Sequence, residues 1–576
     1  MPIDFRRCCR TGAPSPFVTI VAGILTAFAV APVPARAGKA VDVPVPQPIL
    51  TSNQMLAAAV PDECFNGIGI DYPPINADGT CPVGQPKINE SRIWALTEES
   101  GKLWFGTLAN YQCVLTGQVK GAGAAPFSND LLVCEFGKSE GARGHPNVPP
   151  NLGDWRQPSI YSYDLATSTL TKQNIADPLI KQTLGFRGAG SIDNIAFLGG
   201  QNLFAGKAAV NIFAFQADTG EYLGSCSIGG YNYIRGWALV DGALYVGAGS
   251  TTHGAVLRWN GSRANFPGNF CTQFSEVASL PAAVANLALY TGADGKDRLA
   301  ATTVALKNAD VSASAAATVA NGVGAWISPP IPEGGFVAPA TWRQVWSPTQ
   351  YDPDTITARY GYSGGAVVQY DGWLYWGTIH LNGDQAMQVH ESCTGAYCFG
   401  KPANRQQTED LKNGVYRSTS VWRGRNLENP KTREIQLLYG ESELPACCSA
   451  PKTFTMTPTG WTPLYGPSGF GNPNNEYTWQ MAVFDGHLFI GTYDTSNSQV
   501  QSGQAEAGAD LWRFDDSNSP AVNENYTGLG NNLNSGIRAL HALDDGSGLI
   551  VGTSDGFNLS PVGGWELMLL KAGGSQ

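Results

Sequence analysis

Three arginines occupy matching positions in a chain that is otherwise poor in charge. Apolar stretches that end in a tight turn, such as Asp-Gly, recur along the sequence, and aligning the turns gathers a small set of residues. The set is Arg92, Asp193, Asn194, Arg235, Trp479, Gln480 and Arg538. Because a guanidinium group binds carboxylate and phosphate through paired hydrogen bonds, the alignment predicts an anion site. The simpler interpretation is that these arginines pair with acidic neighbours and fill the space between the repeats.

A second group of residues has the chemistry of a weak metal site. His380, Asp384 and His390 fall within eleven residues, and imidazole with carboxylate is a common donor set for divalent metals. The chain has only 6 His and shows no further ligand set, so a solvated loop is the favoured interpretation. Asp352 and Asp354 have the spacing of two calcium ligands. We expect no resident cofactor, with calcium as the one ion that the sequence leaves open.

The segment Gly361-Tyr362-Ser363-Gly364-Gly365 matches the G-x-S-x-G pattern of serine hydrolases. That pattern is catalytic when the serine sits on a turn between a preceding strand and a following helix. Here an apolar stretch at 366–370 follows the motif, so a strand comes after it. We therefore expect a glycine-rich entry to a strand, and we predict no catalytic residue.

The elements that position these residues follow from an internal repeat. A short apolar strand that leads into glycine begins at Leu103, Leu203, Leu244, Leu374, Leu488 and Leu549, and Leu299 begins a seventh copy with Thr302 in place of the glycine. Most copies follow another apolar stretch and a tight turn, as at 237–242, 367–372 and 481–486. Asp-Gly between two apolar runs favours a two-residue hairpin turn. Each unit is therefore predicted to contain a β-hairpin.

A third apolar stretch follows in most units, at 211–215, 255–259, 414–418, 510–514 and 565–569. Three to four antiparallel strands per unit, repeated about seven times, predict an all-β fold, a β-propeller with seven blades. One such sheet cannot bury both faces alone, whereas sheets packed around an axis can. The pattern resembles that of secreted bacterial β-propellers over residues 88–572, and the resemblance implies a fold without a specific activity.

The spacing of the repeat also predicts the domain organisation. Residues 88–576 are expected to form a single β-propeller domain with two long insertions, at about 109–190 and 379–476, where the copies lie furthest apart. Residues 38–87 are expected to be an N-terminal extension, with a strand within 45–60 that closes the ring. Long ordered loops on a rigid scaffold commonly carry binding residues.

Ten cysteines follow residue 37, and an even number in an exported chain predicts disulfides. Neighbour spacing predicts Cys64–Cys81, Cys113–Cys134 and Cys226–Cys271. Adjacent cysteines pair only through a strained ring, so we expect Cys393 and Cys398 to pair with Cys447 and Cys448, with the choice of partner open. These bridges would stiffen the long insertions.

Residues 1–37 have the features of a secretory signal. Arg6 and Arg7 precede an apolar run at 17–31, and Ala35 and Ala37 supply a cleavage site. Cleavage would remove four Arg and one Asp, which changes the formal net charge from −11 to −14. An acidic chain is a poor match for nucleic acids or anionic membranes. We expect a periplasmic or extracellular protein, with no membrane span after cleavage and no nucleic-acid partner.

These observations favour a binding module over an enzyme. Histidines are few and scattered, whereas an enzyme usually clusters its titratable residues. The expected ligand is a protein, a glycan or a cell-surface component, bound at the mouth of the channel and by the long loops. The alternative is an enzyme that works in the central channel, as a hydrolase, a lyase or a cofactor-dependent oxidoreductase.

Overall fold

The turns of the repeat are hairpins in the computed structural model. Asp241 and Gly242, with φ of 50° and 71°, join β14 (Tyr233–Val240) to β15 (Ala243–Gly249). Positive φ at both central positions gives a turn whose twist matches that of the flanking strands. The structure describes residues 47–70, 72–120, 123–137, 148, 150–203, 208–306, 322–380, 384–496 and 507–573. The expected signal segment 1–37 lies outside the described residues.

The strands assemble into antiparallel units of four. Three units are separate sheets: β10 to β13 (Thr183–Ile192, Ile195–Asn202, Ala209–Gln216, Tyr222–Gly229), β14 to β17 (with Gly254–Trp259 and Phe274–Leu280 as the outer pair) and β18 to β21 (Ala283–Thr291, Asp297–Val304, Ala325–Ile327, Arg343–Trp346). In each unit the first two strands form a hairpin. In the first of these sheets the predicted position of the second strand is wrong, because β11 ends at Asn202 and the repeat copy expected at Leu203 begins just after it.

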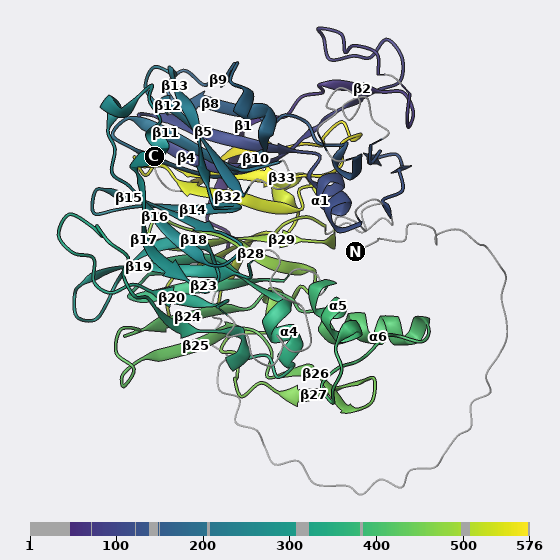
Figure 1. Ribbon diagram of the computed structural model, residues 1–576, viewed down its shortest axis with the longest axis vertical. Coiled ribbons are helices and arrows are strands. Elements are labelled where there is room, and N and C mark those ends of the chain that lie inside the picture. The colour runs from purple at the N-terminus through teal and green to yellow at the C-terminus, as the bar shows by residue number, and fades with distance from the viewer. Residues whose placement is uncertain are drawn as a thin grey trace, which may run out of the picture. The chain divides into compact units, whose positions relative to one another are not determined.

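Sixteen further strands form one extended sheet, and this sheet also divides into units of four strands. These units are β4, β5, β8 and β9 (Glu90–Glu99, Lys102–Ala109, Ile160–Asp164, Thr169–Lys172), β22 to β25 (Tyr362–Tyr370, Trp373–His380, Val421–Arg425, Glu434–Tyr439), β28 to β31 (Asn475–Phe484, His487–Asp494, Leu511–Phe514, Val522–Asn525), and β32, β33, β34 and β1 (Gly536–Ala542, Leu549–Ser554, Glu566–Ala572, Leu50–Ala58). Single residue pairs link them, and Ser554 with Arg92 links the last unit to the first. The result is a mostly β, propeller-like fold (Figure 1).

A predicted third strand is also wrong. The segment 414–418 is not the third strand of its unit, because α6 (Arg405–Val415) extends into it. Asn404 begins this helix and accepts a hydrogen bond from the backbone of Gln407 (3.0 Å), as a capping residue does. The third strand is β24 instead, where Val421 and Trp422 are fully buried against the neighbouring units.

The core lies between neighbouring units. Ile195 and Phe197 of β11 pack with Leu244 and Val246 of β15 in one cluster. Another cluster joins Ile93 and Leu103 of the first unit to Ile550 and Leu567 of the last. Each sheet thus buries both faces only through its neighbours, which is the packing that the repeat requires.

The repeat glycine marks the closest approach of adjacent units. A side chain there would collide with the first strand of the next unit. The pairs are Gly106 with Phe186, Gly199 with Ile234, Gly247 with Val284, Gly377 with Thr478, Gly491 with Ile537 and Gly552 with Ile93. At the fourth contact the roles are exchanged, because Thr302 replaces the glycine and meets Gly364, whose added Cβ would lie 2.5 Å from that of Thr302.

This exchange suggests a direct test of the contact. Gly491→Ala is expected to lower the free energy of unfolding by ~1–3 kcal/mol, because the new Cβ would lie 2.6 Å from the Cβ of Ile537. In an Ile537→Gly background the same change should cost almost nothing, since the next nearest atom is a carbonyl oxygen at 3.4 Å. Denaturant unfolding of the four proteins measures the coupling. Gly229→Ala, at a strand glycine with open space, is the control; an equal cost in both backgrounds would refute the explanation.

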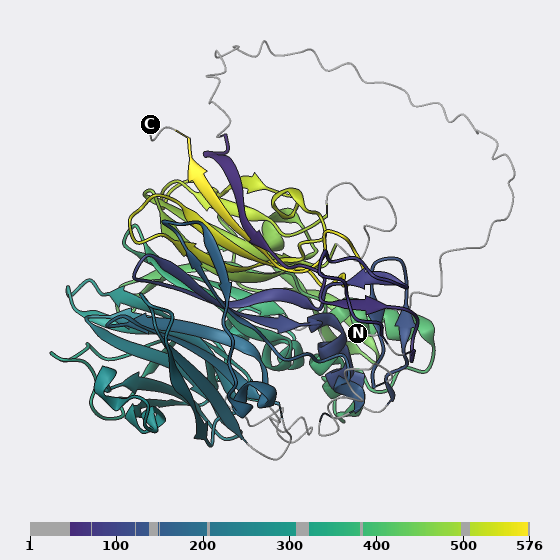
Figure 2. The same ribbon diagram turned by 90° about the horizontal axis from the view of Figure 1, so that it is seen from above.

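A strand lies within the interval 45–60, where the sequence predicts one. It is β1, which pairs antiparallel with β34 from Leu50 opposite Ala572 to Ala58 opposite Glu566. The backbone N–H groups of Ile49 and Leu50 also donate to the carboxylate of Glu524 (3.1 Å each). Figure 2 shows this purple strand beside the yellow strand at the other end of the chain.

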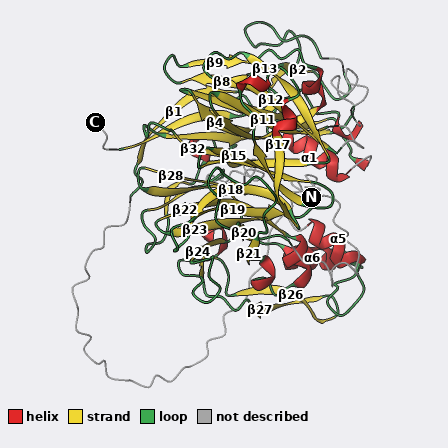
Figure 3. Ribbon diagram, turned by 60° about the vertical axis from the view of Figure 1, so that its left-hand side comes forward, coloured by secondary structure: helices red, strands yellow, loops and turns green. Residues whose placement is uncertain are grey.

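The elements outside the four-stranded units gather on one side of the molecule (Figures 1 and 3). They are β2 (Glu63–Phe65), β3 (Gln85–Lys87), α1 (Tyr111–Lys120), β6 (Phe127–Ser128), β7 (Val133–Cys134), α4 (Thr355–Tyr360), α5 (Asp384–Ser392), α6, β26 (Glu443–Ala450) and β27 (Thr453–Pro458). Short 3-10 helices cover Pro150–Leu152, Pro178–Gln182, Arg263–Asn265, Phe270–Gln273, Pro348–Gln350, Ser468–Gly471 and Gly528–Gly530. The interval 109–190 also holds β8 and β9, and 379–476 holds β24 and β25, so each combines loop and sheet.

The described residues form five disulfides, and three of them are those that the spacing predicts: Cys64–Cys81, Cys113–Cys134 and Cys226–Cys271. The expected cross-pairing of the other four is wrong, because Cys393 bonds Cys398 and Cys447 bonds Cys448. Cys393 directly follows α5, and the turn after it brings Cys398 to a Cα distance of 5.7 Å, within disulfide range. All four cysteines still pack in one cluster. Among the described residues, no helix is long and apolar enough to cross a membrane.

Candidate anion-binding site

A cavity of about 230 Å³ lies where the first strands of the units meet. Its lining includes residues of β4, β10, β14, β18, β22, β28 and β32, so every four-stranded unit contributes its first strand. The polar side chains of the lining are Arg187, Arg235, Asn286, Gln480, Arg538 and His541. The cavity is therefore a section of a central channel.

β-Bulges position the arginines of this channel. Arg187 is the unpaired residue between two paired ones on β10, and Arg538 has the same place on β32. On β14, Arg235 and Gly236 lie between paired residues opposite a single residue of β15. A bulge bends its strand and re-aims the side chain, which is why bulges concentrate next to functional sites.

Four arginines, Arg92, Arg187, Arg235 and Arg538, form what we call the arginine layer. In the part of the chain that the structure describes, none of the four forms an ion pair with a carboxylate. The Nε atoms of Arg187, Arg235 and Arg538, and Nη2 of Arg235, are buried without a hydrogen-bond partner among these residues. Arg92 Nε donates to Ser554 Oγ (2.9 Å), and Arg538 Nη2 donates to the carbonyl oxygen of Arg187 (3.3 Å).

The electrostatics of the layer are those of crowded, buried cations. Burial lowers the pKa of Arg538 far below its ordinary value, and the charges of Arg235, Arg187 and Arg92 lower it further. Burial likewise lowers the pKa of Arg92 and of Arg187. A buried charge is costly unless it is paired and hydrogen-bonded. The layer therefore carries a positive potential that the described residues do not neutralise.

Aromatic rings support the guanidinium groups from the sides. The Arg92 guanidinium lies 3.7 Å from the ring centroid of Tyr111 and 4.8 Å from that of Trp479. Trp479 also lies 5.5 Å from Arg538, so one indole contacts two arginines. Cation–π contacts of this kind hold a cation in place without neutralising its charge.

Tyr233 reports the same positive potential. Its ring lies 4.5 Å from the Arg187 guanidinium, and its hydroxyl is buried. Burial alone would raise the pKa of this hydroxyl, but the charges of Arg187 and Arg235 outweigh burial and lower the pKa below its ordinary value of 10.0. A buried tyrosine with a lowered pKa requires a strong positive field around it.

The structure brings together most of the residues that the turn alignment selects. Arg235, Gln480 and Arg538 line the cavity, and Arg92 and Trp479 lie beside it. Asp193 and Asn194 are instead the two positive-φ residues of the β10–β11 turn, with φ of 52° and 61°. There Asn194 accepts a hydrogen bond from Ser100 Oγ (2.7 Å).

The alignment misses Arg187, although the sequence carries the signal for it. Arg187 precedes its turn residue Asp193 by six positions, as Arg235 precedes Asp241. Taking Asp193 and Asn194 as the turn would have selected Arg187 in their place. Trp94, Trp237 and Asn286 of the lining are also missed, because nothing in their local sequence separates them from core residues.

The weak metal candidates do not form one site among the described side chains. His380 hydrogen-bonds Thr378 Oγ1 (3.0 Å), and burial together with Arg417 lowers the pKa of His380 to about 3. His390 Nε2 lies 3.1 Å from Asp354 Oδ1, which also accepts from the backbone of Thr357 (2.7 Å) at the start of α4. The side chain of Asp384 lies outside the described residues.

The possible calcium ligands Asp352 and Asp354 have protein partners. Both are buried, and Asp352 Oδ2 accepts from Arg417 Nε (2.7 Å). Ser363, the serine of the G-x-S-x-G segment, lies within β22, so the strand begins earlier than the expected start at 366 and includes most of the motif. These contacts assign the residues structural roles, and calcium binding stays a prediction.

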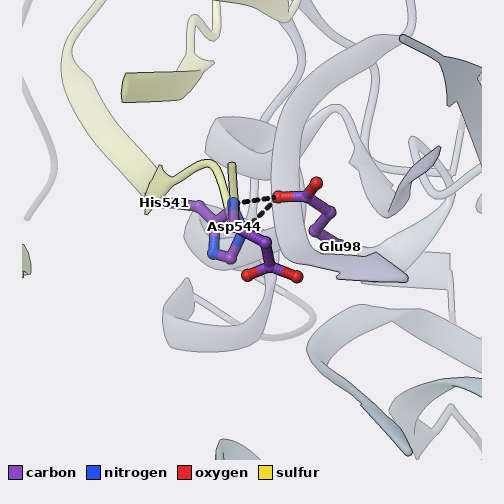
Figure 4. Close-up of side chains that lie close together, drawn as sticks. All are labelled: Glu98, His541 and Asp544. Atoms are coloured by element: carbon purple, nitrogen blue, oxygen red, sulfur yellow. Dashed lines mark hydrogen bonds and ion pairs between the residues drawn. The ribbon is translucent and has the colours of Figure 1, made fainter. Parts of the chain in front are cut away.

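Glu98, His541 and Asp544 are a second group whose ligand atoms are close enough to share one cation (Figure 4). His541 Nε2 lies 3.1 Å from Glu98 Oε2, and the same oxygen accepts from the backbone of Asp544 (3.0 Å). Burial and the charge of Glu98 raise the pKa of Asp544. As they stand, these hydrogen bonds tie the last four-stranded unit to the first, next to the cavity.

Comparison with known proteins assigns no family to this chain. No protein-family model matches the sequence, and no curated protein matches it. Among solved structures, the chain aligns over 84% of its length with 97% of hydrazine synthase from Kuenenia stuttgartiensis, at 10% identity and a TM-score of 0.41. It aligns over 91% of its length with 99% of the polysaccharide lyase Uly1, at 9% identity and a TM-score of 0.35.

A prolyl endopeptidase aligns with 81% of this chain at 10% identity and a TM-score of 0.37. This chain spans only 45% of that protein. Several of these solved structures contain β-propellers. At this low similarity, no ligand or activity can be transferred from these proteins to this chain.

Proposed function

We propose that the protein is an exported, seven-bladed β-propeller that binds an anionic ligand in its central channel through the arginine layer. The ligand is a small organic acid or an acidic group on a larger glycan or protein. The observation that carries the proposal is the set of buried guanidinium groups with unpaired Nε atoms around one cavity. Protein interiors pair almost all of their buried donors, so an orphaned set around a cavity points to a missing acceptor.

The seven-blade count rests on the contacts between units. Seven glycine contacts join the second strand of one unit to the first strand of the next, and the contact of Gly552 with Ile93 returns to the starting unit. β1 would complete the last blade as its outermost strand. Such closure gives a rigid frame, which fixes the arginines before a ligand arrives and lowers the entropy cost of binding.

Export is supported by the disulfides. Cys64–Cys81, Cys113–Cys134 and Cys226–Cys271 need an oxidising compartment to form and persist. The periplasm or the exterior of the cell provides one, in keeping with the expected signal at 1–37. A non-catalytic role agrees with the scarcity of histidine.

An enzyme of the lyase class is the second candidate, and Tyr233 is the residue that favours it. A tyrosine hydroxyl with a lowered pKa is suited to take a proton from a bound acid. Such a role would need the hydroxyl to reach the ligand. Binding alone explains the arginines without this additional requirement.

Tyr233 provides the test of anion binding. A bound anion opposes the charges of Arg187 and Arg235, so it is expected to raise the pKa of Tyr233 and, by linkage, to bind more weakly as the pH rises through that pKa. Ultraviolet titration of the phenolate, with and without an excess of phosphate or a carboxylate, measures the shift. Tyr233→Phe should abolish it, whereas Tyr397→Phe, at an exposed tyrosine, should not. A phenolate titration that no anion alters would contradict the proposal.

A further inference from the structure

The positive charges of the channel are concentrated on one side of it. Arg538, Arg92, Arg187 and Arg235 lie on β32, β4, β10 and β14, which are the first strands of four consecutive units. The first strands of the other three units, β18, β22 and β28, contribute no charged residue to the lining that the structure describes. A ligand in the cavity therefore meets the arginine layer on one side and a neutral side, formed by these three strands, on the other.

The surface that the cavity offers to a ligand is polar nearly all round. Apolar side chains of the lining, such as Val367, Met481 and Leu540, belong to core clusters between the units. On the neutral side, Asn286 and Gln480 supply amide groups. Asn286 Nδ2 donates to a backbone carbonyl oxygen of β22 (2.6 Å), which holds that amide in place. Fixed polar groups of this kind orient a small molecule, so they suit a ligand with a hydrophilic body.

No acidic side chain of the described lining balances the arginine layer, because this lining contains neither aspartate nor glutamate. Glu98 lies next to the cavity, but its carboxylate is held by the imidazole of His541 (3.1 Å) and by the backbone N–H of Asp544 (3.0 Å). A ligand with one negative charge would leave most of the layer unbalanced, and a buried charge without a partner is costly. A ligand with more than one negative charge therefore matches the layer better.

The donors of the layer are also distributed over separate strands. Arg187, Arg235 and Arg538 come from three different units, and the Nε atom of each is buried without a hydrogen-bond partner among the described residues. A guanidinium group binds one carboxylate through two parallel hydrogen bonds. Two carboxylates on a short chain can therefore engage two of these guanidinium groups, whereas a single compact anion has its charge in one place.

We infer that the ligand of the channel is a small, hydrophilic organic acid with at least two carboxylate groups, which bind the arginine layer while its polar body contacts the neutral side. This inference rests on the proposed anion binding and adds the ligand class to it. The cavity of about 230 Å³ equals roughly eight water volumes at ~30 Å³ each, which suits a short dicarboxylic acid.

Calorimetric titration of the whole mature protein with a matched series of probes, at constant ionic strength, tests the inference. Succinate, succinamate and succinamide share one skeleton and carry two, one and no negative charges at neutral pH. We expect succinate to bind at least about tenfold more tightly than succinamate, where tenfold corresponds to ~1.4 kcal/mol. Succinamide should show no measurable binding. Inorganic phosphate, which carries its charge on one compact group, should bind more weakly than succinate.

The outcomes separate the two claims. If succinamate binds as tightly as succinate, the dicarboxylate ligand is overturned and anion binding stands. If phosphate binds at least as tightly as succinate, the need for two separate carboxylates is overturned and anion binding again stands. If none of the three anions binds, or if succinamide binds as well as succinate, the proposed anion binding is overturned with it.

Gln480 allows the charge balance to be changed without removing an arginine. Gln480→Glu turns a neutral amide of the lining into a carboxylate of nearly the same size. Because the new charge replaces one charge of the ligand, most of the preference for succinate over succinamate should be lost. Gln54→Glu makes the same change at an exposed glutamine of β1, and it should leave the preference unchanged.

A second variant covers the case in which Gln480→Glu does not fold or binds neither probe. Arg187→Met removes one charge from the arginine layer, so it should also reduce the preference for succinate over succinamate. A Gln480→Glu or Arg187→Met protein that folds and keeps the full preference for succinate would refute the inference.

Discussion

A mature chain that lacks residues 38–60 is expected to melt at least about 3 °C below the parent. The deletion removes β1 and leaves β34 as an unpaired edge from Glu566 to Ala572. Each backbone hydrogen bond lost costs ~1 kcal/mol, and the half-buried Leu50 and Leu56 leave their clusters. The exposed edge is also a template for pairing with another chain. Differential scanning calorimetry and light scattering measure the two effects.

The matched control is deletion of residues 38–46 alone, which keeps β1. That variant should melt with the parent. A synthetic peptide of residues 47–60, added to the longer deletion, should restore the melting temperature, because the strand can pair with β34 from solution as it does within the chain. An unchanged melt after the longer deletion would show that β1 contributes nothing to closure of the last unit.

The parts of the fold that the sequence predicts are those fixed by local chemistry. An Asp-Gly pair between two apolar stretches, such as Asp241 and Gly242, favours a tight hairpin turn. The hairpins and their repetition can therefore be predicted from the sequence alone. The helix at 405–415 is not visible in the same way. Its residues are mostly polar, and the segment 414–418, which overlaps its last turn, resembles the start of a strand in isolation.

The disulfides mark a similar limit. Cys113 and Cys134 sit in one excursion, so their spacing in the sequence suffices to pair them. Cys393 and Cys398 are also close in the sequence. A bond between the adjacent Cys447 and Cys448 needs a strained ring, however, and this strain favours cross-pairing of the four cysteines. Which cysteines bond depends on how α5 ends and turns, and no local pattern shows that.

In the candidate site, too, the sequence predicts what depends on local spacing and misses what depends on contacts between units. Turn alignment finds Arg235 and Arg538 because their distance from a turn fixes their place on a strand. Whether a carboxylate lies close to these arginines depends on side chains from other units, which the sequence alone does not place. The sequence therefore favours ion pairs that the described residues do not form. The bulges are equally hidden, since they arise where adjacent first strands crowd around the axis.

Replacement of Arg235 and Arg538 by methionine is expected to change binding and stability in opposite directions. Each charge-assisted hydrogen bond contributes ~1.5–3 kcal/mol, so loss of two arginines should weaken anion binding by about 100-fold or more. The protein without ligand should become more stable, because two buried guanidinium groups with unpaired donors are replaced by apolar side chains. Titration with inorganic phosphate or acetate and thermal unfolding of Arg235→Met/Arg538→Met measure both.

Arg263→Met is the control, because Arg263 forms an exposed ion pair with Glu221 (3.2 Å) away from the channel, and its loss should change neither quantity appreciably. The opposed signs make the experiment decisive. Arginines kept for structure would stabilise the protein, and their removal would lower both the melting temperature and any binding that depends on the fold. Arginines kept for a ligand carry a cost in the empty channel that the ligand offsets. A double variant that melts below the parent, or that binds the anion as tightly as the parent, would therefore assign the layer a structural role.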